Sequence, residues 1–580
     1  MDCTEAVYSE DYFDFINTLS REVNMRNGDE ILCSQPLDNG FEVLFYPREV
    51  VENGDFNIAR LTYIGVPKCY ALMDTSALEG TGILTMQNFP TLPLKGNGVL
   101  MGFIDTGIDY QNPVFQSENG TTRILRIWDQ TVRTGTQPEG FLYGSEYTAE
   151  DINYAIRSED SYSIVPSRDT NGHGTFLAGV AAGSEVLERD FIGAAPLADI
   201  AVVKLKEAKQ YLRDFYHIKE GAVAYQENDI MAGIAYLHNL AYTLSKPLVL
   251  CLGLGTNSGG HGGTSALSML LSYVAAKRMR AVVVAAGNEA NARRHYLGNL
   301  APLQEYEDVE ISVGDNIGGF TAELLTNSPE VVSVAVQSPT GESQPLIPAR
   351  QGSSEEYRFL LEGTTVSISY SLGEFTRERE LIFLRFTNPS KGIWRLRVYP
   401  ENYVTSRYHI WLPVTEFVQG DIFFLRSNPE TTITGPASAY APISVGGFNA
   451  SDDSLYLDSG RGYNIDTLTV GETVNPQVSR MTIMITGNDH DRDQMIKQLR
   501  KLHDVHFVKE MVAEKSVCRE LVLLKVATDR SNRQEIIDAA NVFRNKIIDY
   551  STDAITMELT GETKKLDAFI ELMKEYGILE

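Results

Sequence analysis

The sequence predicts a multidomain α/β protein. It comprises a parallel sheet with helices on both faces, an N-terminal α+β region, an inserted all-β region and a C-terminal α+β region. Length is the first observation, because 580 residues correspond to about three to five domains. The second is a series of continuous apolar runs that alternate with helical segments, as a parallel sheet buried on both faces requires. The third is a block of short alternating strands that interrupts this series.

The N-terminal α+β region covers residues 1–95. We expect a helix over residues 8–24 and a strand over residues 40–45. Residues 92–98 are rich in proline and glycine, so they should form a turn-rich connector to the next region.

The parallel sheet is predicted from residues 96–301 and 429–462. Its strands are expected at residues 99–104, 199–205, 247–252, 281–286 and 441–446. The helices between them are expected at residues 175–183, 227–244 and 266–280. Residues 302–428 interrupt this pattern with short alternating runs, which are typical of an antiparallel β-sandwich or jelly roll. The clearest of these runs are at residues 309–313, 365–370 and 394–398.

The C-terminal α+β region covers residues 463–580. Its strands are expected at residues 479–485, 521–526 and 554–559. Amphipathic helices are expected at residues 491–504, 533–545 and 563–576. Strands and helices therefore alternate to the end of the chain, which predicts a small βαβ-rich domain.

The composition excludes several classes of function. The formal net charge is −27, which disfavours nucleic-acid binding because phosphate contacts need clustered lysine and arginine. No run of 18 or more uncharged apolar residues occurs, so we expect no transmembrane helix. The acidic N-terminus lacks the basic start and apolar run of a signal peptide.

Cysteine usage points the same way. The five cysteines, at positions 3, 33, 69, 251 and 518, are few, odd in number and widely spread. This argues against a disulfide scaffold and against a cysteine-type zinc site, and it fits a reducing compartment. No motif implies a metal or a cofactor.

Two polar residues stand out in the parallel-sheet region. Asp105 directly follows an apolar run, at the edge where open parallel sheets place their sites; taken alone, it is more often a turn residue. His173 lies between Gly172 and Gly174 at the start of a small-residue helix. The two glycines allow neighbouring backbone to approach closely, which a merely structural histidine does not require.

A third polar residue, Asn288, follows the apolar run at residues 281–286. Its side-chain amide can donate to a developing oxyanion, although an Asx-turn is the alternative. Asp105-Thr106-Gly107, His173-Gly174-Thr175 and Gly287-Asn288 occur in this order and together resemble the subtilisin-like serine proteases. The resemblance implies that Asp105 orients the imidazole, His173 is the general base and Asn288 is an oxyanion donor. Residues 252–255 resemble the strand with which extended substrates of that family pair.

Over residues 1 to about 460, the chain more closely resembles the clostridial Csp germination proteases. This resemblance implies a prodomain at residues 1–95 and a jelly roll at residues 302–428 inserted into the subtilisin-like core. It also implies a polypeptide substrate, the precursor of a cortex-degrading hydrolase. The expected location is cytoplasmic or spore-associated.

The nucleophile of that family lies in Gly-Thr-Ser-x-Ala-x-Pro, and no such motif follows Asn288. Ser265 stands in Gly-Thr-Ser-Ala but upstream of Asn288, where we expect it to cap a helix. Ser438, in Gly-Pro-Ala-Ser, is expected to be structural. Without a serine no acyl-enzyme forms, so we expect a serine-type endopeptidase that is inactive. The alternative is a non-catalytic pseudoprotease with a signalling role.

The C-terminal region carries a different set of motifs. Tyr463-Asn464-Ile465, Arg480-Met481-Thr482-Ile483 and Leu566-Asp567-Ala568-Phe569 resemble the regulatory small subunit of acetolactate (acetohydroxyacid) synthase. The resemblance implies a truncated, ferredoxin-like ACT domain, and the catalytic subunit of branched-chain amino-acid biosynthesis as a partner.

Paired ACT domains of that family bind valine, and Asn464 and Ile465 match a strand of the ligand site. The alternative for Asn464 is a strand-start asparagine. The family's first strand, ligand loop and first helix would precede Tyr463 and do not. We therefore expect no valine response.

The two resemblances meet at Arg461-Gly462-Tyr463. The first family loses its serine segment there, and the second loses its opening βα unit. Natural fusions join near domain boundaries, so we hypothesise a recombined or misassembled reading frame. A parallel sheet without the helix that carries the serine should also leave an apolar face uncovered.

Overall fold

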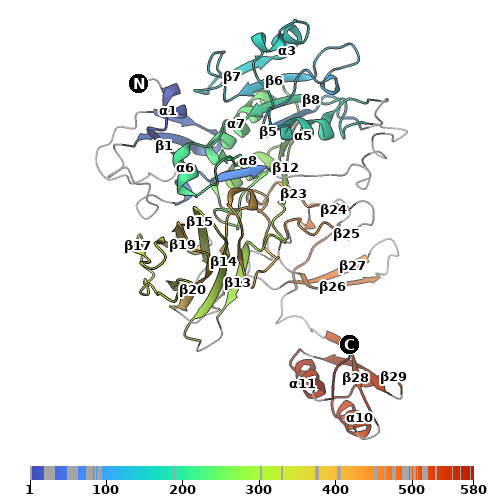
Figure 1. The fold of residues 1–580 in the computed structure, drawn as a ribbon. Coiled ribbons are helices and arrows are strands. Elements are labelled where there is room, and N and C mark those ends of the chain that lie inside the picture. The colour runs from blue at the N-terminus through green and yellow to red at the C-terminus, as the bar shows by residue number, and fades with distance from the viewer. Residues whose placement is uncertain are drawn as a thin grey trace. The chain divides into compact units, whose positions relative to one another are not determined.

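The structure is a computed structural model of the 580-residue chain (Figure 1). It describes residues 3–18, 33–48, 63–72, 94–186, 191–300, 304–327, 331–372, 378–401, 407–449, 454–462, 465–472, 479–485, 507–511, 520–529, 532–551, 553–561, 563–574 and 576–579, and positions 83, 87, 496, 499, 500 and 505. The chain divides into two compact units, Met1–Arg492 and Asp493–Glu580.

A seven-stranded sheet forms the centre of the first unit. Its order is β23-β12-β10-β5-β8-β6-β7, and all neighbours are parallel except β6 and β7. The five strands expected from apolar runs are present as β5 (Leu100–Asp105), β8 (Asp199–Lys204), β10 (Leu248–Leu252), β12 (Arg280–Ala285) and β23 (Ile443–Val445). The edge adds β6 (Ile124–Asp129) and β7 (Ser145–Thr148).

Helices cover both faces of this sheet, as the apolar runs predict. One core cluster packs α7 (Glu227–Thr243) and α8 (Ala266–Ala275) against the strands. A second packs α3 (Ala149–Ile156) and α5 (His173–Ala182) against the opposite face. Two short helices, α4 (Ser161–Ile164) and α6 (Gln210–Phe215), complete the region. The edge strand β23 leaves Ile443 50% and Val445 44% exposed.

The N-terminal segment contains α1 (Cys3–Tyr8), then an antiparallel sheet in the order β1-β3-β2. The helix predicted over residues 8–24 is wrong, because β1 (Tyr12–Thr18) is a strand there. The alternation of Phe13 and Phe15 with Tyr12 and Ile16 fits a strand buried on both faces, and aromatic residues favour strands. The other strands are β2 (Cys33–Pro36), β3 (Phe41–Pro47) and β4 (Cys69–Leu72), with 3-10 turns η1 (Asp38–Gly40) and η3 (Tyr63–Gly65).

Residues 295–424 form two antiparallel sheets that share one apolar core around the buried Trp394, consistent with the expected β-sandwich. The six-stranded sheet has the order β13-β21-β15-β19-β18-β17, and the four-stranded sheet β16-β20-β14-β22. Their bounds are β13 (His295–Asn299), β14 (Glu307–Val313), β15 (Gly319–Asn327), β16 (Val332–Gln337), β17 (Ser354–Arg358), β18 (Thr365–Leu372), β19 (Glu378–Thr387), β20 (Gly392–Pro400), β21 (Arg407–Trp411) and β22 (Ile422–Phe424).

Three parts of the first unit share a further core. Tyr63 and Phe215 both contact the Phe383 ring, with ring centroids 5.5 and 5.3 Å away. Close by, the buried Glu323 carboxylate accepts hydrogen bonds from the Tyr63 hydroxyl and, at 2.8 Å, from the Gly259 backbone N–H. The N-terminal segment, the parallel-sheet region and the β-sandwich therefore share one apolar cluster and a buried, hydrogen-bonded carboxylate.

The remaining elements follow residue 446. Two hairpins, β24 (Phe448–Asn449) with β25 (Ser454–Leu455) and β26 (Ile465–Glu472) with β27 (Ser479–Ile485), belong to the first unit. The second unit has an antiparallel sheet in the order β28-β30-β29, its own apolar core and, among its described residues, the two longer helices α10 and α11. Its elements are β28 (Glu520–Ala527), α10 (Arg533–Val542), β29 (Lys546–Tyr550), β30 (Ala554–Gly561) and α11 (Thr563–Lys574). The sequence did not predict β29, and most of the helix expected at residues 491–504 lies outside the described residues.

The structure can be compared with the sequence-based predictions about disulfides and membrane spans. Cys33 is disulfide-bonded although no disulfide scaffold is expected, whereas Cys69 and Cys251 are free thiols. Burial raises the pKa of both free thiols to about 12, which keeps them protonated at neutral pH. In the described part of the chain, no helix is long and apolar enough to cross a membrane.

Helix α5 lies against the turn after β5 through a glycine, which yields a first prediction. A Cβ on Gly174 would overlap the Gly107 carbonyl oxygen, whereas a Cβ on Gly179, in the same helix, would meet nothing within 4 Å. We expect Gly174→Ala to lower the free energy of unfolding by about 1–3 kcal/mol. The matched control Gly179→Ala should raise it by up to about 1 kcal/mol, because alanine favours a helix interior. Denaturant unfolding measures both, and equal effects would contradict the close approach.

A second prediction concerns Glu289, which connects the end of β12 to the β-sandwich. Its carboxylate is 1% exposed and accepts hydrogen bonds from the N–H and hydroxyl of Thr415, each at 3.3 Å. Burial, reinforced by Glu416, raises the pKa of Glu289 to about 7. The folded state therefore holds this proton more tightly than the unfolded state, and stability is lost as the pH rises through about 7.

Glu289→Gln should remove that loss. The stability of the variant relative to the wild type should rise between pH 5 and pH 8, by up to about 3 kcal/mol. Thermal or denaturant unfolding across this pH range provides the measurement. A difference that stays constant with pH would show that Glu289 does not titrate there.

Candidate active site

Asp105 and His173 meet at the carboxyl edge of the parallel sheet. Asp105 is the last residue of β5, and His173 is the first residue of α5. The His173 Nδ1 and Asp105 Oδ1 atoms are 2.8 Å apart. The carboxylate side chain is 1% exposed and the imidazole 12%, so the pair is shielded on the Asp105 side and open on the His173 side. The pairing predicted from the two motifs is present.

Backbone contacts hold this pair in place. The Thr106 N–H donates to Asp105 Oδ1 at 2.7 Å, which leaves the carboxylate turned toward the imidazole. The Gly174 N–H donates to the Thr106 hydroxyl oxygen at 2.9 Å, which joins the start of α5 to the turn after β5. Gly107 in that turn has a φ of 120°, a conformation that only glycine adopts without strain.

Asp169 organises the loop that precedes His173. Its carboxylate accepts hydrogen bonds from the N–H groups of Gly172 and Thr175 at 2.8 and 2.9 Å, and from the Thr175 hydroxyl at 2.6 Å. Burial alone would raise the pKa of Asp169, but these hydrogen bonds lower it below its ordinary value. Asp169 therefore stays ionised and fixes the entry into α5. Sequence reasoning missed this role, although an aspartate six residues before a helical threonine offers a signal.

Asn288 lies just beyond β12, at the same edge of the sheet. Gly287 before it has a φ of 90°, and a Cβ there would come within 2.6 Å of Thr434. The Asn288 Oδ1 atom is buried and has no hydrogen-bond partner among the described residues. The turn therefore places the Asn288 carboxamide at the sheet edge, where its oxygen accepts no hydrogen bond from a described residue.

An extended segment of the chain runs through this site. Strand β4 lies between β11 (Leu254–Gly255) and β9 (Tyr225–Gln226) in a three-stranded sheet. It pairs antiparallel with both: Leu254 is opposite Leu72, and Gln226 is opposite Cys69. A Cβ on Gly253, just before β11, would lie 3.2 Å from His173 Cε1. The strand position beside the imidazole thus holds residues of the N-terminal segment.

The structure places Ser265 and Ser438, the two serines singled out by sequence, within the folded scaffold. Ser265 is the N-cap of α8, where its hydroxyl oxygen accepts from the Ser268 N–H at 3.1 Å, as expected. Ser438 is 6% exposed and precedes β23 by a few residues. Asn464 lies outside the described residues, and Ile465 opens β26, opposite Ile485. No group of three or more metal-ligating side chains occurs among the residues that the structure describes.

The arrangement suits one kind of chemistry. A buried carboxylate that holds an imidazole by Nδ1 fixes the tautomer in which Nε2 can accept a proton. A peptide that pairs as an extended strand with β11 and β9 is bound mainly through its backbone. An imidazole, a carboxamide and a position for an extended peptide therefore lie at one edge of the sheet.

Comparisons with known proteins identify two families in the chain. Residues 96–315 match the model of the subtilase family. Residues 457–507 match an acetohydroxyacid synthase small subunit-like ACT domain, and residues 519–580 match the small subunit of acetolactate synthase. Among solved structures, the CspB protease of Clostridium perfringens is similar, with 28% sequence identity and a TM-score of 0.57. The match covers 73% of this chain and 87% of that protein.

Two curated relatives match over a shorter stretch. The probable acetolactate synthase small subunit of Methanothermobacter thermautotrophicus is 47% identical over 125 residues, 21% of this chain and 74% of the relative. That of Archaeoglobus fulgidus is 47% identical over 120 residues, 21% of this chain and 75% of the relative. The chain thus carries a subtilase-family domain at residues 96–315 and, over about its last fifth, belongs to the acetolactate synthase small-subunit family.

Proposed function

We propose that residues 1–462 form a subtilisin-like serine-protease scaffold of the spore-germination type that binds polypeptide without hydrolysing it. The contact that supports this most directly is the 2.8 Å pairing of His173 Nδ1 with Asp105 Oδ1. In this proposal Asp105 orients the imidazole, His173 is the general base and Asn288 is the oxyanion donor. Hydrolysis fails because no nucleophilic serine motif follows Asn288 in the sequence.

The organisation of domains in this proposal follows the sequence. Residues 1–95 are a prodomain, residues 96–301 and 429–462 are the subtilisin-like core, and residues 302–428 are an inserted jelly roll. Strand β4 of the prodomain supports this assignment, because it occupies the extended position between β11 and β9. A substrate would have to displace β4 before it could pair with the same two strands.

A signalling pseudoprotease is the form that this function would take. The base, its aspartate and the peptide position persist, and together they can bind an extended polypeptide without cleaving it. Similarity to the CspB protease favours a polypeptide ligand, and a germination setting would make it the precursor of a cortex-degrading hydrolase.

A second function is favoured for the C-terminal region by its family membership. We infer that residues 463–580 can pair with an acetolactate synthase catalytic subunit in branched-chain amino-acid synthesis. The second unit supports this, because its sheet and helices enclose a core of their own. Valine sensitivity would need Asn464 and Ile465 together with the ACT segments that do not precede Tyr463, so we propose binding without feedback control.

The first test of the protease proposal uses a fluorophosphonate probe, which labels an activated serine. We expect no labelling of the full chain and no peptide hydrolysis above background. His173→Ala should behave identically, because the base has no nucleophile to activate. Labelling of Ser265, Ser438 or any other serine that disappears in His173→Ala would overturn the proposal and make the chain an active protease.

The second test mixes the full chain with an acetolactate synthase catalytic subunit. We expect co-elution on size exclusion, and a synthase rate that is the same with and without valine. An authentic small subunit of the family, run in parallel, should confer valine inhibition. A valine-dependent rate with this chain would contradict the proposed loss of the ligand site, and absence of co-elution would contradict the pairing.

A further inference from the structure

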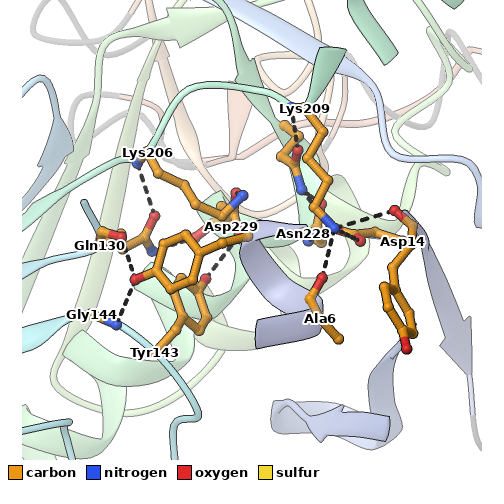
Figure 2. Close-up of polar contacts among 12 residues, drawn as sticks. Ala6, Asp14, Gln130, Tyr143, Gly144, Lys206, Lys209, Asn228 and Asp229 are labelled. Carbon is orange, nitrogen blue, oxygen red and sulfur yellow. Dashed lines mark hydrogen bonds and ion pairs between the residues drawn. The ribbon is translucent and has the colours of Figure 1, made fainter. Parts of the chain in front are cut away.

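Lys209 of the parallel-sheet region is buried among groups of the N-terminal segment. Its side chain is 2% exposed, and its ammonium lies 2.6 Å from Asp14 Oδ1. The ammonium also donates to the carbonyl oxygens of Ala6, at 2.9 Å, and Tyr12, at 3.3 Å (Figure 2). Each of these three acceptors belongs to α1, to β1 or to the first residues of the chain.

The second oxygen of the Asp14 carboxylate is held by two side-chain amides of the core. Oδ2 accepts from Gln226 Nε2 at 2.7 Å and from Asn228 Nδ2 at 3.2 Å. The Gln226 amide cannot turn away, because its Oε1 accepts the Lys209 backbone N–H at 2.9 Å. Asp14 is completely buried, so an ammonium and two amides converge on one carboxylate out of contact with water.

The same amide belongs to the strand beside the candidate active site. Gln226 is the second residue of β9, which pairs through its backbone with Cys69 and Tyr70 of β4. Its side chain faces Asp14 while its backbone borders the extended peptide position. The contact between the Asp14 carboxylate and Gln226 therefore stabilises the position of β9.

A second buried pair nearby differs in its partners. Lys206 and Asp229 are 2.6 Å apart, and the Tyr143 hydroxyl donates to Asp229 at 2.9 Å (Figure 2). All three residues belong to the parallel-sheet region, so this pair stays complete without the N-terminal segment. Lys209 instead makes its direct 2.6 Å pair with a carboxylate of the N-terminal segment, while Asp229 contributes only a longer-range attraction. The Asp14 position is therefore filled from outside the parallel-sheet region.

We propose that Lys209, Gln226 and Asn228 form a carboxylate-binding site, that Asp14 fills it, and that its occupation holds β9 in place beside β4. The ligand class is a single carboxylate, supplied here by the chain's own aspartate. Breaking one side of such a pair leaves a buried charge without a partner, which is strongly destabilising. The inference concerns binding alone and stands whether or not the chain hydrolyses peptides.

Chemical rescue of Asp14→Ala in the full chain tests the site. The substitution leaves a space the size of a carboxylate next to Lys209, and formate is the probe. We expect a lower thermal midpoint than wild type and faster amide exchange at residues 69–72 and 225–226. Formate should restore both in a saturable way, relative to chloride at the same ionic strength.

Two controls separate the site from general salt effects. Wild type and the double variant Asp14→Ala/Lys209→Gln should show no formate-specific change. Glu10→Ala, which removes exposed contacts to the Gln210 N–H at 3.0 Å, should leave exchange at β9 unchanged. A folded Asp14→Ala that ignores formate, or one as stable as wild type, would overturn the proposal.

A second set of variants covers the case in which Asp14→Ala does not fold. Asp14→Asn and Lys209→Gln each leave one buried charge alone, whereas the double variant Asp14→Asn/Lys209→Gln replaces both charges with amides. We expect the double variant to be more stable than the sum of the single losses predicts. Additive losses, or a double variant that does not fold, would contradict a specific carboxylate–ammonium site.

Discussion

The position of β4 between β11 and β9 is the constraint on which the other parts of the first unit depend. An extended strand there needs hydrogen-bonding neighbours on both edges, and β11 and β9 supply them. Gly253, just before β11, lies beside His173. Recognition along a strand is mainly through the backbone, so it does not select one sequence. The selective contacts are made farther away, by buried side chains that hold the rest of the N-terminal segment.

Glu323 shows how those side chains connect the parts. Its buried carboxylate accepts hydrogen bonds from the Tyr63 hydroxyl, in the N-terminal segment, and from the Gly259 N–H, in the loop that follows β11. Burial raises the pKa of Glu323, which the two donors and Lys68 oppose. Because a buried carboxylate is costly unless it is fully hydrogen-bonded, the β-sandwich, the loop and the N-terminal segment stabilise one another.

The sequence predicted the parts of this structure that depend on local periodicity. Asp105 could be placed at the sheet edge because it follows an apolar run, and its pairing with His173 was implied by the resemblance of the two motifs to the subtilisin-like proteases. β1 was missed because a short strand buried on both faces lacks the polar–apolar alternation that identifies strands. Asp14 and Glu323 could not be assigned, since their partners are contributed by segments that only the tertiary fold brings near. Asp169 differs, because its partners Gly172 and Thr175 are local in sequence. The sheet edge is thus readable from sequence, and its supporting contacts are not.

The core that joins Tyr63, Phe215 and Phe383 also sets an order of events during synthesis. Phe13 and Phe383 belong to the same cluster but are about 370 residues apart in the chain. At about 5–20 residues per second, a ribosome needs roughly 20–70 s to add that length. The aromatic residues of the N-terminal segment therefore stay exposed until their last partners have been synthesised. Chaperone demand should be greatest in that interval, and slow translation would lengthen it.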